Sequence, residues 1–182
     1  MNSYSTDLAN PANSDVYTVE YAEFVQTLNR VAMRDYLNHA FFVAGGGLAV
    51  ENTLKAAFDW KTRKNLAAGR NAEYGLKAIH FRNAFHGRTG YTMSITDTAD
   101  PRKTMFFPKL DWPRIDNPRM VFPMEGDNLA RVEAAECVAE GQILNAVAHY
   151  KNSVACLILE PIQGEGGDNH FRPEFIRKLR AL

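Results

Sequence analysis

Cysteine is scarce in this sequence, with only Cys137 and Cys156 among its 182 residues. The two have neither CxxC spacing nor the spacing of metal ligands, so neither a zinc site nor a disulfide framework is predicted. We expect two reduced thiols, which is typical of a cytoplasmic protein.

Net charge and long apolar runs are lacking as well. The 21 basic and 21 acidic side chains cancel, so no basic field indicates a nucleic-acid partner. No apolar stretch approaches the roughly 20 residues of a membrane-spanning helix. The first residues, MNSYSTDLANPANSD, have neither the basic start nor the apolar core of a secretory signal. The 46% hydrophobic and 23% charged residues are typical of a soluble globular domain without membrane partners.

Several well-known catalytic motifs are missing. The sequence contains no GxxxxGK[ST], no GxGxxG after a strand, no GxSxG and no HExxH. Its histidines share no spacing that would make a metal site, so we predict no bound metal.

The pattern of apolar residues predicts alternating helices and strands. Residues 1–15 are rich in Asn, Ser and Asp and predict a loop, and residues 16–182 predict a single domain. Helices are predicted from Tyr17 to about Ala32, from about Val50 to Asn65, over 128–150 and from Pro173 onward, and strands over 41–44, 77–81, 119–122 and 154–159. The four prolines of residues 96–119 predict a long irregular excursion instead. This alternation favours an α/β fold with a mainly parallel sheet and flanking helices.

Three of the predicted strands are followed by unusual loops. These loops are Gly45–Gly47, Phe85–Arg88 and Glu160–Gly167. In open α/β sheets ligands collect at the carboxyl ends of the strands, so parallel strands would bring all three loops to one edge. The glycine turn before a helix is either an anion seat or a tight turn. Together the loops suit a small, flat, charged ligand.

Individual residues in these loops have a functional and a structural interpretation. Phe85 either lies against a planar ligand or fills the core, and Arg88 either binds a carboxylate or phosphate or forms an internal ion pair. His86 is either an acid-base group or a hydrogen-bonding loop residue. Glu160 follows an apolar strand, where an acid needs a function or a partner. Glu165, between two glycines, is expected to be exposed and movable.

The same loops resemble those of class III, pyridoxal-phosphate-dependent aminotransferases. The resemblance rests on the glycine turn, on FHGR and on EPIQGEGG, and extends from about residue 13 to the end. AVENTLKAAFDWK, DWPRID and GGDNHFRPEF are most similar to the lysine 6-aminotransferase branch of that family. The resemblance implies part of a fold-type I large domain, in a cytoplasmic homodimer.

It also implies a role for each loop residue. Gly46 and Gly47 would hold the cofactor phosphate through backbone N–H groups, with Gly47 standing where the wider class has a hydroxyl residue. Phe85 would stack on the cofactor ring. Arg88 would bind the α-carboxylate of lysine. Glu165 would resemble the acid that moves aside for 2-oxoglutarate, and Glu160 would support the site.

No lysine of this sequence matches the cofactor-binding lysine of such enzymes, so no catalytic residue is assigned. We expect an internal fragment, without the C-terminal part of the large domain and without the small domain. We expect the parent protein to transfer the terminal amino group of lysine to 2-oxoglutarate, and the fragment alone to be inactive. The alternatives are an ornithine- or 4-aminobutyrate-type aminotransferase, or a non-catalytic remnant that binds a phosphate ligand or another protein.

Overall fold

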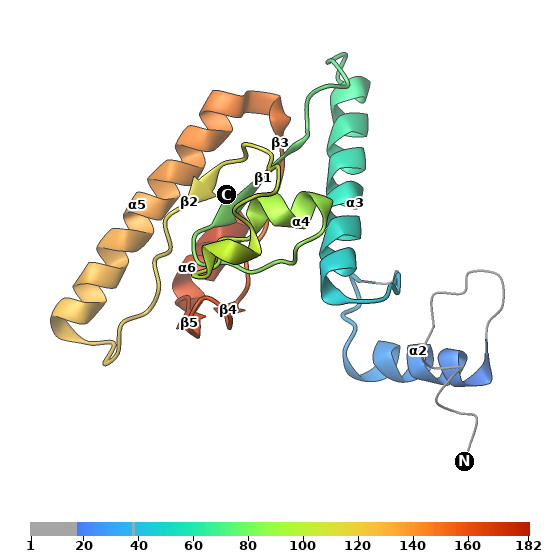
Figure 1. Ribbon diagram of the computed structural model, residues 1–182, viewed down its shortest axis with the longest axis horizontal. Coiled ribbons are helices and arrows are strands. Elements are labelled where there is room, and N and C mark those ends of the chain that lie inside the picture. Colours follow the sequence, from blue (N-terminus) through green and yellow to red (C-terminus); the bar gives the residue numbers. More distant parts are fainter. Residues whose placement is uncertain (1–17, 38) are drawn as a thin grey trace. The chain divides into compact units, whose positions relative to one another are not determined.

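A computed structural model describes residues 18–37 and 39–182 of the chain. The chain divides into two compact units, Met1–Ala49 and Val50–Leu182, which are described separately (Figure 1). The predicted loop over residues 1–15 lies outside the described residues, and so does Tyr17.

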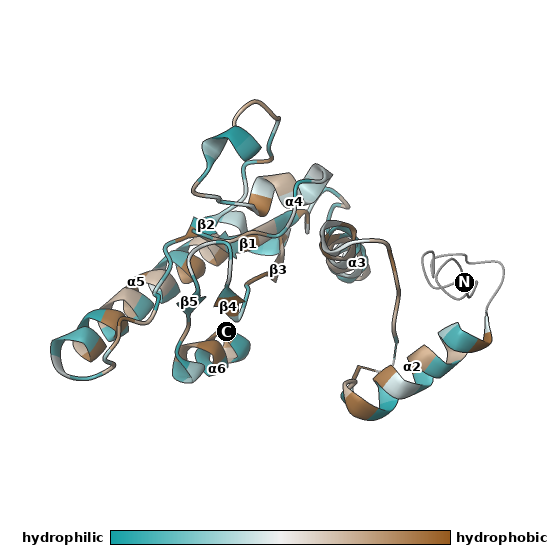
Figure 2. Ribbon diagram, turned by 60° about the horizontal axis from the view of Figure 1, so that its bottom comes forward, coloured by the Kyte–Doolittle hydropathy of each residue, from teal (hydrophilic) through white to brown (hydrophobic). Residues whose placement is uncertain are grey.

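In the first unit, the predicted amphipathic helix is confirmed. Helix α2 covers Val19–Val31, and the side chain of Thr18 caps it by accepting a hydrogen bond from the Tyr21 N–H at 3.1 Å. None of its residues is buried. Apolar residues therefore lie on the surface of this helix (Figure 2).

The strand predicted over residues 41–44 is wrong, because this segment is irregular. Phe42 packs its ring edge-on against Tyr21 and Phe24 of α2, at centroid distances of 5.7 and 5.4 Å. The aromatic residues that indicated a strand thus make side-chain contacts with a helix and have no β partner in the described part of the chain. Helix α3, Gly46–Ala67, follows directly.

The second unit is built on three parallel strands in the order β2-β1-β3. The central strand β1 covers Lys77–Phe81, as predicted. It pairs with β2, Arg114–Ile115, and with β3, Val154–Leu157. The sequence did not predict β2, because its two residues lie inside the proline-rich excursion. The predicted parallel sheet is confirmed.

Helices cover both faces of this sheet (Figure 1). Ile79 and Phe81 of β1 pack in a core with α5, Gly126–Tyr150, and α6, Pro173–Ala181. Ala78 faces the other way, into a core with Leu54 and Phe58 of α3 and with the short helix α4. Successive residues of a strand point to opposite faces, so β1 supplies both cores.

Helix α4 covers Gly90–Ile95. The sequence predicted only a loop here, because Gly87 and Gly90 interrupt any pattern. The long helix α5 is confirmed and continuous, and Gly141 lies within it without a break. The segment between α4 and β2, residues 96–113, contains one turn of 3₁₀ helix, η1, Pro101–Lys103. A second such turn, η2, Lys151–Ser153, precedes β3.

Two strand predictions near the C-terminal half need correction. Residues 119–122 form no strand, since Met120 makes a single backbone bond, from its N–H to the His170 carbonyl, at 2.8 Å. The strand predicted over 154–159 ends at Leu157, and its residues are half-buried because β3 lies at the edge of the three strands.

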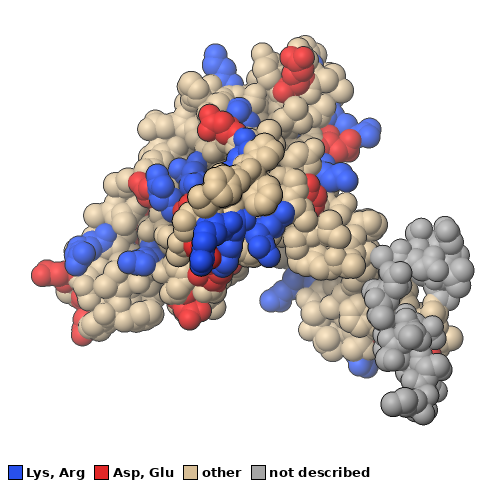
Figure 3. Space-filling model, in the orientation of Figure 1, with Lys and Arg blue, Asp and Glu red and all other residues tan. Residues whose placement is uncertain are grey.

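After β3 the chain forms an antiparallel hairpin of β4, Ile162–Gln163, and β5, Asn169–His170. This hairpin presents residues 164–168 as a tight turn. Basic and acidic side chains both occur on the face of the second unit drawn in Figure 3, in keeping with the zero net charge of the sequence. Among the described helices, none has the length and apolar character required to cross a membrane.

Candidate functional site

The exits of β1 and β3 meet at one edge of the sheet, as the sequence predicted for parallel strands. The Phe85 N–H donates a hydrogen bond of 2.7 Å to Oε1 of Glu160. Burial raises the pKa of the Glu160 carboxyl, although the bond from Phe85 acts in the opposite direction. Glu160 therefore has the partner that an acid at the end of an apolar strand requires, and it fixes the backbone that carries the Phe85 ring.

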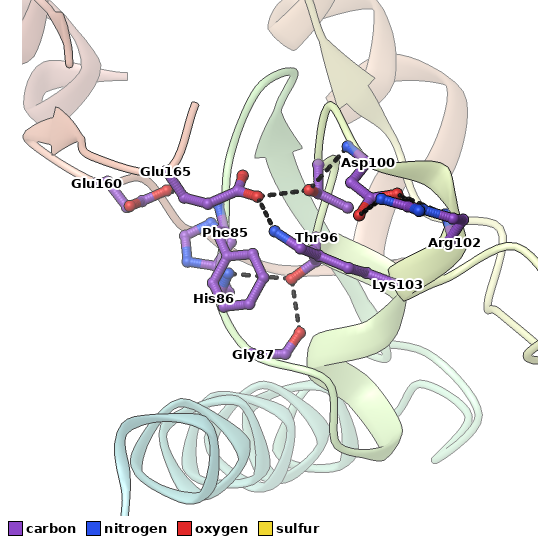
Figure 4. Close-up of polar contacts among 10 residues, drawn as sticks. Phe85, His86, Gly87, Thr96, Asp100, Arg102, Lys103, Glu160 and Glu165 are labelled. Carbon is purple, nitrogen blue, oxygen red and sulfur yellow. Dashed lines mark hydrogen bonds and ion pairs between the residues drawn. The ribbon is translucent and has the colours of Figure 1, made fainter. Parts of the chain in front are cut away.

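Thr96, at the C-terminal end of α4, holds the loop that contains Phe85. Its Oγ1 accepts a hydrogen bond from the His86 N–H at 3.0 Å and donates one to the Gly87 carbonyl at 2.7 Å (Figure 4). Gly87 has φ of +117°, a conformation that side chains with a Cβ rarely adopt. The FHG sequence thus forms a fixed turn in which Gly87 is required by its backbone conformation.

Glu51 of α3 holds the other end of the same loop. Its carboxylate accepts hydrogen bonds from the Thr89 hydroxyl at 2.7 Å and from the N–H groups of Tyr91 and Thr92 at 3.0 and 3.3 Å. These N–H groups begin α4 and have no acceptor within the helix. A carboxylate at a helix N-terminus is also favoured by the helix dipole. Glu51 therefore anchors the residues that follow Arg88.

His86 is buried, and its Nε2 has no hydrogen-bond partner among the described residues. Burial lowers the pKa of His86 to about 4, so the ring is neutral at physiological pH. A buried polar atom without a partner is uncommon in folded proteins and calls for an explanation. This buried atom belongs to the residue next to Phe85.

Arg88 is exposed, and its side chain makes no hydrogen bond or ion pair within residues 18–37 and 39–182. The internal ion pair that the sequence left open as an alternative is therefore wrong for the described part of the chain. An unpaired guanidinium on a fixed loop is available to a carboxylate or phosphate.

Glu165 is less free than the sequence indicated. Its Oε1 accepts hydrogen bonds from Lys103 Nζ at 2.7 Å and from the Thr98 hydroxyl at 2.5 Å (Figure 4). These bonds, that of Lys103 first, lower the pKa of the Glu165 carboxyl. The next residue, Gly166, approaches β1 so closely that an added Cβ would lie 2.0 Å from the Asn83 carbonyl oxygen. The hairpin turn is therefore packed against the exit of β1.

The glycine turn, residues 45–47, belongs to the first unit. Gly45 has φ of +99°, and α3 begins at the next residue. A Cβ added at Gly46 would meet no atom of the described residues within 4 Å, so packing does not explain this glycine. The N–H groups of Gly46 and Gly47 lie in the first helical turn, which carries no acidic side chain. The turn is thus open to an anion.

The structure brings Phe85, Glu160 and Glu165 together, and Arg88 follows on the same loop. Four other contributors were not predicted: Glu51, Thr96, Thr98 and Lys103. Each acts on a residue at a distance in the sequence, for example 62 positions between Lys103 and Glu165, so no local motif identifies it. No group of His, Cys, Asp and Glu suited to a metal ion occurs in the described part of the chain.

A surface pocket lies beside α4 and is lined in part by Glu51. It has a volume of about 530 Å³ and is bordered by α3, α4 and residues 108–110. None of the predicted site residues lines it. The hydrogen-bonding groups of the predicted site are concentrated instead at the strand exits.

Comparisons with known proteins fit this geometry. Residues 12–182 match the aminotransferase class-III family. The chain is 51% identical over 175 residues to the L-lysine-epsilon aminotransferase of Mycobacterium tuberculosis, covering 96% of this chain and 38% of that protein. It is 49% identical to the L-lysine-epsilon aminotransferase of Amycolatopsis lactamdurans, with 94% of this chain and 38% of that one covered. The 4-aminobutyrate aminotransferase of Emericella nidulans is 30% identical, with coverage of 98% and 39%.

Solved structures agree with the sequence relatives. The lysine aminotransferase of M. tuberculosis matches with a TM-score of 0.89 at 48% identity, over 98% of this chain and 41% of that chain. The chain thus spans about two fifths of the length of the relatives it matches. The predicted α/β fold of the pyridoxal-phosphate aminotransferases is confirmed, and the chain belongs to the class-III aminotransferase family.

Proposed function

We propose that this chain is part of a pyridoxal-phosphate-dependent lysine 6-aminotransferase, which transfers the terminal amino group of L-lysine to 2-oxoglutarate. The observation that carries the proposal is the identity of 46–51% to L-lysine-epsilon aminotransferases, against 30–33% to 4-aminobutyrate aminotransferases. A 4-aminobutyrate- or ornithine-type activity is the nearest alternative.

The residues present fit the cofactor. Gly46 leaves open space before a helix N-terminus, which suits a phosphate dianion. Phe85 is half-buried and suits a flat ring. In our proposal Gly46 and Gly47 donate backbone N–H bonds to the phosphate, and Phe85 stacks on the ring. When bound, pyridoxal phosphate supplies an electron sink for the loss of a proton from the amine-bearing carbon.

Arg88 binds the α-carboxylate of lysine. Its planar guanidinium can form two parallel charge-assisted bonds to a carboxylate, and it has no internal partner in the described part of the chain to give up. Holding lysine by its α-carboxylate presents the distal amine, and not the α-amine, for reaction. The position of Arg88 on a loop fixed by Glu51 and Thr96 supports this role in substrate orientation.

Glu160 supports the site by holding the Phe85 backbone, and Glu165 adjusts the site to the second substrate. We propose that Glu165 faces the site while lysine reacts and moves aside for 2-oxoglutarate, which carries two carboxylates. The hairpin turn with glycines at 164, 166 and 167 supports a movement confined to the Glu165 side chain and its immediate backbone.

None of the lysines of this chain is proposed to bond the cofactor. Lys103 Nζ lies 5.8 Å from the centroid of the Phe85 ring, but it is engaged by Glu165. Reduction of the loaded full-length protein with borohydride, followed by peptide mapping, tests this assignment. We expect the cofactor label outside these 182 residues, and a label on any of them contradicts the proposal.

We further propose that the full-length enzyme is a cytoplasmic homodimer without nucleic-acid partners. The free thiols of Cys137 and Cys156 support the location. The apolar surface of α2 and the exposed Met105, Phe106 and Phe107 support an interface with a second copy. Analytical ultracentrifugation of the full-length protein tests the dimer, and a monomer at micromolar concentration overturns it.

The central experiment is a donor profile of the full-length protein. Loaded with pyridoxal phosphate and supplied with 2-oxoglutarate, it is assayed for glutamate with lysine, ornithine or 4-aminobutyrate as donor. We expect the highest kcat/KM with lysine. A higher value with either other donor replaces the lysine assignment, and no turnover with any donor supports a non-catalytic role.

A further inference from the structure

Lys103 lies across the site and ends on Glu165. Its Nζ donates to Glu165 Oε1 at 2.7 Å and lies 5.8 Å from the centroid of the Phe85 ring (Figure 4). A cation at this distance from an aromatic face is attracted to it. Lys103 therefore contacts two residues of the proposed site and joins the segment between α4 and β2 to the hairpin after β3.

The position of Lys103 is built into the local structure. It is the last residue of η1, which begins at Pro101 and is capped by Asp100, whose side chain accepts a hydrogen bond from the Arg102 N–H at 3.2 Å. Thr98, just before this turn, donates to the same oxygen of Glu165. The ammonium and the hydroxyl together define one position for the Glu165 carboxylate.

The ion pair is exposed enough to exchange. The side chains of Lys103 and Glu165 are 36% and 27% exposed. Pairs with this degree of solvent access contribute little to stability, so the carboxylate can leave at small cost. Figure 3 shows Lys and Arg side chains grouped near the centre of the drawn face, over the segment between α4 and β2.

The negative charge of Glu165 acts on the neighbouring Glu160 carboxyl. It contributes to the raised pKa of Glu160, the residue that holds Phe85, as a second cause after burial. A second carboxylate entering beside Phe85 is repelled by the same negative charge unless Lys103 compensates it. An amino donor with one carboxylate is less affected, because its other end is an amine.

We propose that Lys103 is a positioning residue that neutralises Glu165 and holds its carboxylate aside, so that the site admits a dicarboxylic keto acid. This inference rests on the proposed function and deepens it, because it assigns the acceptor specificity to a residue outside the recognised loops. Lys103 acts through Glu165 and takes no part in the bond changes.

The test compares the two half-reactions of the full-length, cofactor-loaded protein. Each half-reaction is followed by cofactor absorbance, with lysine added to the pyridoxal-phosphate form or 2-oxoglutarate added to the pyridoxamine-phosphate form. We expect Lys103→Met to raise the KM for 2-oxoglutarate about tenfold, the effect of one uncompensated charge near a protein surface. The KM for lysine and both maximal rates should change less than about twofold.

Matched variants separate charge from structure. Arg102 lies next to Lys103 in the same turn but pairs with Asp100, so Arg102→Met should leave both KM values unchanged. Lys103→Arg should retain most of the wild-type behaviour. Removing the uncompensated charge in the double variant Lys103→Met/Glu165→Gln should lower the KM for 2-oxoglutarate again, relative to Lys103→Met alone.

Four results overturn the inference. An unchanged KM for 2-oxoglutarate in Lys103→Met removes the proposed charge effect. An equal loss of both maximal rates with unchanged KM values indicates a merely structural role. If Lys103→Met fails to fold, Thr98→Val must still raise the KM for 2-oxoglutarate selectively; it removes the hydroxyl that contacts Glu165 and accepts the Asp100 N–H. If the wild type performs neither half-reaction, the proposed function fails, and this inference fails with it.

Discussion

Glu160 offers a sharp test of how the site is assembled, because one hydrogen bond joins the exits of β1 and β3. Its carboxylate accepts the Phe85 N–H at 2.7 Å, a short bond between an amide and a charged group. Replacing Glu160 with Ala leaves this part-buried N–H without its acceptor. Replacing it with Gln retains a neutral acceptor of nearly the same shape.

Two effects of opposite sign determine how far a replacement of Glu160 changes the free energy of unfolding. Loss of the acceptor costs about 1–3 kcal/mol, the usual penalty for a buried donor without a partner. Against this, burial raises the pKa of Glu160, so removing its charge regains part of the desolvation cost. For Glu160→Ala the lost bond dominates, and we expect a decrease of about 1–2 kcal/mol in the free energy of unfolding. Glu160→Gln keeps an acceptor, and its weaker bond is offset by the regained desolvation, so we expect a change within about 0.5 kcal/mol.

The sign of the pH dependence follows from the same pKa. A carboxyl group whose pKa is raised in the folded state favours folding at low pH, and this contribution is lost as the pH rises through the folded-state pKa. Relative to the wild type, Glu160→Gln should therefore become more stable between pH 4 and pH 7. Urea unfolding of the full-length protein without cofactor measures these differences.

Hydrogen exchange gives the local readout. The Phe85 amide should exchange faster in Glu160→Ala than in the wild type, and at a nearly unchanged rate in Glu160→Gln. Equal exchange of this amide in all three proteins, with equal stability of the two variants, would refute the assigned bond.

Three further predictions concern the other residues of the site. Arg88→Ala should raise the KM for lysine about 10- to 100-fold, because a charge-assisted contact to the carboxylate is lost, while the absorbance of bound cofactor stays the same. The control is Arg63→Ala, which removes an exposed i,i+4 ion pair. Equal loss of cofactor binding and lysine binding in Arg88→Ala contradicts the proposed role. Gly46→Ala should leave the free energy of unfolding unchanged or raised, because the added Cβ meets nothing among the described residues. The same change should weaken cofactor binding, measured by equilibrium dialysis. An unchanged affinity argues against a phosphate contact at Gly46. Burial lowers the pKa of His86 from 6.5 to about 4, so its contribution to stability is present above pH 6.5 and is lost toward pH 4, by about 3 kcal/mol at most. In the cofactor-free protein, the free energy of unfolding should therefore fall less steeply with decreasing pH in His86→Gln than in the wild type. Identical slopes contradict the buried neutral ring.

The parts of the fold that the sequence predicted are those in which local pattern and packing agree. The strand over 77–81 is apolar and central, and it pairs on both sides. The helix from Pro173 begins with a residue suited to a first helical turn. The meeting of the loops after β1 and β3 followed from parallel strands alone, and the Phe85 to Glu160 bond confirms it.

The parts that the sequence missed depend on distant partners. Residues 41–44 have strand-forming side chains, but Phe42 packs on α2. The short helix α4 exists although it begins at Gly90, because Glu51 accepts its first N–H groups from about 40 positions away. Lys103 carries no motif, and only the fold of the proline-rich segment brings it to Glu165. These contacts join residues that are far apart in the sequence, so local sequence patterns cannot predict them.

The most direct test of the central claim follows the nitrogen atom. The full-length protein is loaded with pyridoxal phosphate and given 2-oxoglutarate and lysine labelled with ¹⁵N at either the terminal or the α position, and the glutamate formed is analysed by mass spectrometry. If Arg88 holds the α-carboxylate and presents the distal amine, glutamate carries the label only from the terminal position. Label transferred from the α position, or from neither, contradicts the account.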